Sequence, residues 1–117
     1  MRPEARKYLY DIQKACELIG RFTSGKTFVD YSTDALLRSG VERQFEIIGE
    51  ALSQMLKIDP SLAGHVTETR RIIAFRNILI HGYAAVSDEV VWDVLRVDLP
   101  TLRKEVGSLL ESAEGSA

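Results

Sequence analysis

Cysteine and histidine are scarce in this sequence, and their scarcity narrows the classes of site the protein can hold. The one cysteine, Cys16, cannot form a disulfide within the chain, which excludes a small disulfide-stabilised secreted scaffold. Cys16 lies in an apolar stripe and is expected to be inert core. It shares no clustered spacing with the two histidines, so a zinc site is disfavoured. We expect neither a metal ion nor another cofactor.

Long hydrophobic runs are also missing. The longest stretch without Asp, Glu, Lys or Arg runs from Asn77 to Ser87, far below the roughly 20 residues that a membrane helix needs. Arg2, Glu4 and Arg6 lie near the N-terminus, which therefore contains no apolar signal core. The sequence accordingly predicts a cytoplasmic protein without a membrane segment.

Neither sign of charge is in excess, since 15 Lys and Arg face 17 Asp and Glu for a net charge of -2. This balance argues against binding of nucleic acid over the whole surface, so any site for a polyanion must be a local patch. The 117 residues fit one domain and contain no internal repeat. We predict a single domain over residues 1–112 and a disordered tail over 113–117.

Apolar residues recur with helical period along most of the chain. The pattern predicts helices over about 3–22, 32–57 and 66–80, a short turn over 27–31, and a last helix from Ser87 that Pro100 breaks near Asp98. No run alternates as a strand would. The predicted fold is therefore all-α, an antiparallel bundle of four to five helices.

Two details refine the second long helix. Ser32 or Thr33 is expected to cap its N-terminus, because their hydroxyls can accept from the free backbone amides there. Gly49 lies in its interior, where glycine costs roughly 1 kcal/mol relative to alanine. A close approach of another helix at Gly49 would explain that cost.

The most informative segment is 76–83, with the sequence Arg-Asn-Ile-Leu-Ile-His-Gly-Tyr. In a helix, the neighbours of Arg76 are all isoleucine or leucine. Burying an unpaired cation is expensive, so Arg76 needs a partner or a function. Glu46 and Glu50 on the second long helix are candidate structural partners, and such an ion pair is compatible with a catalytic role.

Arg76 and His81 differ by about 140° around a straight helix and cannot both reach one small substrate. Either the helix loosens before His81, which Gly82 favours, or two copies of the chain meet in a homodimer. Cleavage of RNA by its own 2′-hydroxyl needs a base, an acid and a cation near phosphorus. Imidazole and guanidinium groups supply these roles, and a twofold axis brings two of each together.

Three further residues are candidates for the same site. Asn77 is placed to hydrogen-bond the His81 ring or a phosphate. Arg70 and Arg71 add positive charge beside the segment and are candidate phosphate contacts.

The pattern Arg76-Asn77-x-x-x-His81-Gly82-Tyr83 resembles the Arg-x4-His and His-x-Tyr signature of the HEPN superfamily, especially its HepT-like bacterial toxin ribonucleases. Residues 45–51, 91–93 and 98–100 resemble further segments of that group. The resemblance implies a HEPN-like homodimer that is the toxin of a toxin–antitoxin system, a metal-independent endoribonuclease acting on RNA. Arg76 and His81 would be catalytic, with Asn77 in support.

The resemblance also implies a protein partner, a cognate minimal nucleotidyltransferase antitoxin that transfers AMP to Tyr83. The added bulk and negative charge would block the place of the RNA phosphate. The sequence departs from the family around residues 63–71, where Gly64-His65-Val66-Thr67 replaces a frequent aromatic or Pro-Trp entry. Contacts to RNA or to the partner can therefore differ there.

Two other interpretations stay open at this stage. In the first, the chain is a non-catalytic helical module that binds a nucleotidyltransferase or a nucleotide, and Arg76 only joins helices. His81 then compensates a helix dipole, and Tyr83 is an interface aromatic. In the second, the chain is a dimeric bundle that scaffolds another protein.

Overall fold

The computed structural model describes residues 1–82, 84 and 86–115 of the 117. Within this part of the chain all regular structure is helical. The elements are α1 (Pro3–Thr23), α2 (Phe28–Thr33), α3 (Ala35–Ile58), the 3-10 helix η1 (Pro60–His65), α4 (Thr69–His81), α5 (Asp88–Asp93), the π-helical turn η3 (Val94–Asp98) and α6 (Leu99–Gly115).

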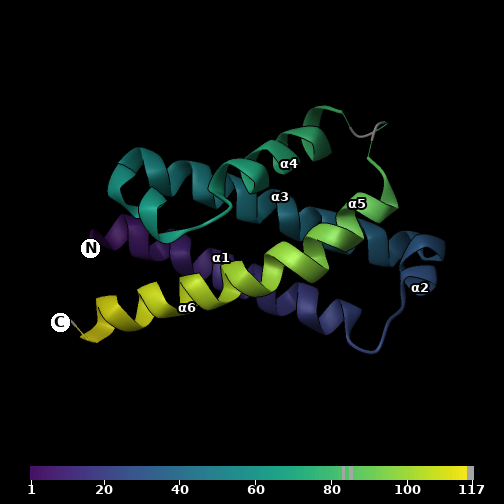
Figure 1. The fold of residues 1–117 in the computed structure, drawn as a ribbon, viewed down its shortest axis with the longest axis horizontal. Helices are drawn as coiled ribbons and strands as arrows, with labels where there is room; N and C mark the ends of the chain where they lie inside the picture. Colours follow the sequence, from purple (N-terminus) through teal and green to yellow (C-terminus); the bar gives the residue numbers. More distant parts are fainter. Residues whose placement is uncertain (83, 85, 116–117) are drawn as a thin grey trace.

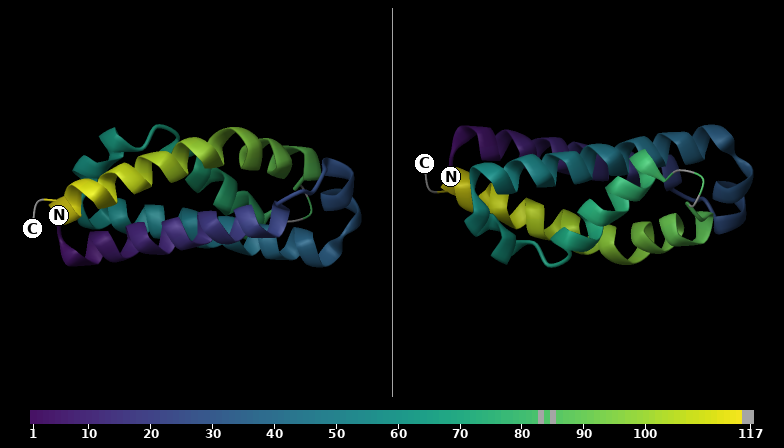
Figure 2. Two further views of the ribbon diagram at one scale, coloured as in Figure 1. Left: turned by 90° about the horizontal axis from the view of Figure 1, so that it is seen from below. Right: turned by 90° about the horizontal axis from the view of Figure 1, so that it is seen from above.

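The two longest helices, α1 and α3, lie side by side and run in opposite directions (Figure 1). Helix α4 packs on α3, whereas α6 packs on α1. Figure 2 shows the chain ends together at one end of the bundle and α2 at the other. The predicted all-α bundle is therefore confirmed. None of the described helices is both long enough and apolar enough to span a bilayer.

The core consists of the apolar stripes that the sequence predicts. Helix α4 buries Ile72, Phe75 and Leu79. Phe45 of α3 meets Phe75 edge to face, with ring centroids 5.3 Å apart. Each fully buried side chain of this size stabilises the fold by about 1.5–3 kcal/mol, so this packing supplies the apolar part of the attachment of α4 to the bundle. The other buried core positions of the long helices include Leu9, Ile12, Cys16, Ile19, Val41, Ile48, Leu52 and Met55.

The N-terminal cap of α3 differs from the prediction. Asp34, not Ser32 or Thr33, accepts a hydrogen bond from the Leu37 amide, at 3.1 Å. Ser32 and Thr33 instead end α2, a separate helix with its own capping box at its N-terminus. The prediction of the cap was wrong because that short helix takes up both hydroxyl residues.

The predicted break before Pro100 takes the form of a π-helical turn. Proline lacks a backbone N–H and its ring conflicts with the carbonyl four residues earlier. The wider turn η3 accommodates it, with the Leu99 N–H bonded to the Val94 carbonyl five residues back. The helical path continues through α5, η3 and α6 without a gap (Figure 1). The turn also buries the carboxyl group of Asp98.

The C-terminal helix runs past the predicted domain boundary. Helix α6 extends to Gly115 and buries Ala113. The structure therefore shows helix at residues 113–115, where the sequence predicts the start of a disordered tail.

Candidate active site on helix α4

Helix α4 is 13 residues long and carries most of the candidate site residues. It begins at Thr69, three residues later than predicted, because residues 66–68 form a connection from η1. Its faces are those expected, with Arg70, Asn77 and His81 exposed. At its C-terminal end the Gly82 N–H donates to the Ile78 carbonyl at 2.8 Å. The helix therefore stays regular through His81.

Arg76 lies in a polar network on the seam between α3 and α4. Its Nη2 forms an ion pair with the Glu50 carboxylate, and its Nη1 donates to Oδ1 of Asn77 at 2.7 Å. Glu50 also accepts from Nε2 of Gln54 at 2.9 Å. The side chain of Arg76 is only 20% exposed, and its Nε is buried without a hydrogen-bond partner. Of the two predicted carboxylate partners, Glu50 is the one that the structure selects.

The backbones of α3 and α4 approach each other closely beside this network. A Cβ added to Gly49 would lie 2.6 Å from Cγ of Arg76 and still closer to its Cβ. No side chain fits there without a shift of the helices. The close approach predicted at Gly49 is therefore present, and it brings Arg76 against α3.

His81 ends α4 and is exposed, whereas Arg76 faces α3. A loosened helix before His81 is one way for the His81 and Arg76 side chains to converge. Because α4 stays regular through His81, the structure disfavours that way. Within one chain the imidazole and the guanidinium occupy different sides of the helix. If the two groups act on one phosphodiester, a second copy of the chain would be needed to bring them together. Tyr83 lies outside the described residues.

The two candidate phosphate contacts differ in their surroundings. Arg70 is exposed, and the structure gives it no ion pair with a described residue. Arg71 is held by two carboxylates: its Nη2 lies 3.3 Å from Asp93 and its Nε lies 3.2 Å from Asp98. Burial raises the pKa of Asp98, an effect that Arg71 opposes. The charge of Arg71 is thus partly neutralised by these two carboxylates.

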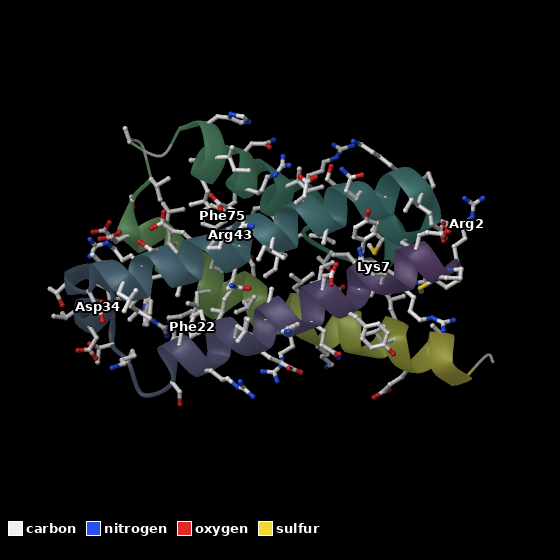
Figure 3. The ribbon with its side chains drawn as sticks, turned by 180° about the vertical axis from the view of Figure 1, so that it is seen from behind. Arg2, Lys7, Phe22, Asp34, Arg43 and Phe75 are labelled. Carbon is white, nitrogen blue, oxygen red and sulfur yellow. The ribbon has the colours of Figure 1, made fainter. Side chains whose placement is uncertain are left out.

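A cleft of about 340 Å³ lies beside the Arg76 network, between α1, α3 and the end of α4. Figure 3 views α1 and α3 from outside, with Arg43 at the surface of α3 and Lys7 on α1. Arg43 pairs with Glu46 at 3.4 Å. In the described part of the chain, no three His, Cys, Asp or Glu side chains gather as a metal ion would require. The cleft is lined by Tyr8, Asp11, Arg43, Glu46, Ile47, Glu50, Ala51 and Ile80.

Sequence reasoning missed the contacts that hold the N-terminal end of α4. The Thr67 amide lies 3.2 and 3.1 Å from the two carboxylate oxygens of Glu105, and its hydroxyl donates to one of them at 2.6 Å. Asp98, in the turn η3, pairs with Arg71 of α4. The only local signal was the position of Asp98 two residues before Pro100, which marked a break without indicating a partner.

The fold is an all-helical bundle in which one helix, α4, carries an imidazole, an amide and a guanidinium. An imidazole and a guanidinium are groups that can cleave a phosphodiester by general acid–base catalysis and charge stabilisation. The family model described as Ribonuclease HepT-like matches residues 12–109, and the chain belongs to this family. The predicted family and enzyme class, a ribonuclease, are confirmed. RNA is accordingly the substrate class of the family.

Individual relatives agree with the family assignment. The chain is 35% identical to "Probable ribonuclease HepT" of Thermococcus cleftensis, over 88% of this chain and 93% of that protein. It is 31% identical to "Putative RNase TTE0752" of Caldanaerobacter subterraneus subsp. tengcongensis, over 91% and 94%.

A third relative is a longer protein. The chain is 32% identical to "Gamma-glutamylcyclotransferase and putative RNase MJ0434" of Methanocaldococcus jannaschii, over 97% of its own length. It spans only 51% of that relative. No solved structure matches the chain.

Proposed function

We propose that this chain is the toxin of a toxin–antitoxin system, a homodimeric endoribonuclease that works without a metal ion. The observation that carries the proposal is the unbroken helix α4, which presents His81 to solvent and Arg76 toward α3. Such an arrangement suits a site completed by a second copy, where the His81 imidazole and the Arg76 guanidinium meet at one phosphodiester. Membership in a ribonuclease family supports the choice of RNA as substrate.

Each group has a chemical role in the proposed reaction. An imidazole takes the proton of the attacking 2′-hydroxyl, and the imidazole of the second copy protonates the 5′-oxygen that leaves. Arg76 stabilises the negative charge that develops around phosphorus. Glu50 and Asn77 hold the guanidinium through Nη2 and Nη1, and each of these nitrogens keeps one N–H for a phosphate oxygen. Asn77 is thus a supporting residue.

The proposed regulation acts at Tyr83. A cognate minimal nucleotidyltransferase would transfer AMP to the phenol oxygen, placing a phosphate and a nucleoside two residues from His81. Negative charge and bulk at that position would oppose entry of RNA. The proposal rests on the family resemblance of the segment 76–83.

A competing function is a non-catalytic module that binds a nucleotidyltransferase or a nucleotide. The ion pair of Arg76 with Glu50 favours it, since a buried arginine that joins two helices needs no other role. The two functions differ in what Arg76→Ala removes. In the module the substitution impairs folding and there is no nuclease activity to lose, whereas in the enzyme it abolishes cleavage.

The purified chain is expected to cleave RNA in the presence of a chelator and to leave 2′,3′-cyclic phosphate ends, because the 2′-hydroxyl is the nucleophile. Arg76→Ala and His81→Ala should each lose most of the cleavage rate. When the parent chain is unfolded and refolded with an excess of His81→Ala, each mixed dimer holds a single imidazole where the reaction uses one from each copy, so the activity per parent chain should fall. The readout is the initial rate of cleavage of a fluorescent RNA. Absence of cleavage by the parent chain would contradict the enzyme.

The regulation has its own test. Co-expression with a cognate minimal nucleotidyltransferase should add the mass of one or more AMP groups to the peptide containing Tyr83, as measured by mass spectrometry. The modified protein should lose RNA cleavage. Tyr83→Phe is the matched control, because it removes only the acceptor oxygen and should stay active after co-expression. A chain left unmodified by an active nucleotidyltransferase would refute the proposed regulation.

A further inference from the structure

The placement of α4 depends on more than its apolar face. The helix has no side-chain cap at its N-terminus, and it packs mainly on α3. Two sets of polar contacts join α4 and the residues just before it to the segment formed by α5, η3 and α6. Thr67 bonds to Glu105, and Arg71 pairs with Asp93 and Asp98. These contacts hold the segment from the side that α3 does not cover.

Asp98 is the buried member of the second set. Its side chain is 4% exposed, whereas Asp93 is 59% exposed and Arg71 49% exposed. It lies in the π-helical turn η3, which Pro100 imposes on the helix. The turn therefore aims a carboxylate out of the C-terminal helix and into contact with α4.

The charges of Arg71, Asp93 and Asp98 indicate that these three residues position α4 and do not bind RNA. One guanidinium faces two carboxylates, so the group is net negative and a phosphate is repelled. Arg70, the exposed neighbour, forms no ion pair with any residue that the structure describes. The role of a phosphate contact therefore suits Arg70, and Arg71 serves to hold α4.

A buried carboxylate is costly even with a cation beside it. Burial raises the pKa of Asp98, and its Oδ2 makes no aligned hydrogen bond although Nε of Arg71 is 3.2 Å away. The neutral form is thus easier to bury than the ionised one. A buried carboxylate with an unbonded oxygen that contacts the helix beside the site is expected to serve the site.

We propose that Asp98 is a positioning residue of the active site: through Arg71 it fixes α4 against η3 and so sets where His81 stands. Arg71 and Arg76 lie five residues apart and tie α4 to different neighbours, η3 and α3 respectively. The helix is thereby held from two directions about 140° apart. The inference rests on the proposed ribonuclease activity.

The first test separates function from stability. Asp98→Asn keeps the shape of the side chain and removes its charge, so at neutral pH its melting temperature should equal or exceed that of the parent. Its kcat should nevertheless fall at least about tenfold with little change in KM, because a displacement of about 1 Å can cost roughly 100-fold in rate. Asp93→Asn is the matched comparison and should lower kcat by less than about threefold, since exposed ion pairs contribute little. Parental kcat in Asp98→Asn would overturn the proposal.

The adjacent arginines provide a second comparison. Arg70→Ala should raise KM and reduce the slope of log affinity against log salt concentration by about one, as loss of a phosphate contact does. Arg71→Ala should leave that slope unchanged and lower kcat. A reduced salt slope in Arg71→Ala would identify it as a phosphate contact and would overturn the inference.

A third measurement does not depend on cleavage. Hydrogen–deuterium exchange of the amides of residues 72–81 should accelerate in Asp98→Asn relative to both the parent and Asp93→Asn. Unchanged exchange would show that α4 is held without Asp98 and would overturn the proposal. If the parent chain cleaves no RNA but the exchange accelerates, the proposed function fails while the fixing of α4 by Asp98 stands.

Discussion

His81→Ala is expected to lower the rate of RNA cleavage by about 10²- to 10⁴-fold, the usual contribution of a positioned general acid or base. The melting temperature should not change, because His81 is exposed at the end of α4 and contributes nothing to the core. The measurement is the initial rate of cleavage with chelator present, beside a thermal unfolding curve. Loss of activity without loss of stability would identify a chemical role.

The chain offers a matched control for this experiment. His65 is the other histidine of the protein, is also exposed, and lies at the end of η1 instead of α4. His65→Ala removes the same group and should retain parental activity. If His81→Ala cleaves as fast as the parent, the catalytic assignment is refuted.

Gly49→Ala is expected to lower the free energy of unfolding by about 1–3 kcal/mol, the usual cost of overpacking a tight interior. The added methyl group would meet Cβ and Cγ of Arg76, which are fixed close to the backbone of α4 and cannot swing aside. The two helices would have to separate, and the ion pair with Glu50 would be displaced. Cleavage should fall as well, since Arg76 moves. Chemical denaturation measures the first effect and the cleavage assay the second.

A second helical glycine serves as the control for this prediction. Gly107 lies within α6, and a Cβ added there would have open space around it. Gly107→Ala should therefore stabilise the protein by up to about 1 kcal/mol through the higher helix propensity of alanine. If Gly49→Ala were stabilising in the same way, the close approach of α3 and α4 would be absent in solution.

Sequence patterns anticipated the helices and their buried faces with only small shifts in their ends. The stripe through Ile72, Phe75 and Leu79 is buried as expected, and Gly49 meets α4 as expected. These features follow from periodicity and from intrinsic preferences, which are encoded within one or two helical turns. The prediction of the α3 cap was wrong on the same scale, because the short helix α2 and the start of the long helix α3 share one stretch of hydroxyl and acidic residues.

The sequence by itself thus determined an all-helical bundle and its family, and it predicted the residue types of the candidate site on α4. Only the tertiary structure decided that Arg76 pairs with Glu50 and not with Glu46, and that Arg71 is held by Asp98 across the bundle. It also decided that α4 runs straight through His81. The physical reason is that these partners are far apart in the chain. Which carboxylate reaches which guanidinium depends on the rotation of whole helices about their axes, and local patterns do not encode it.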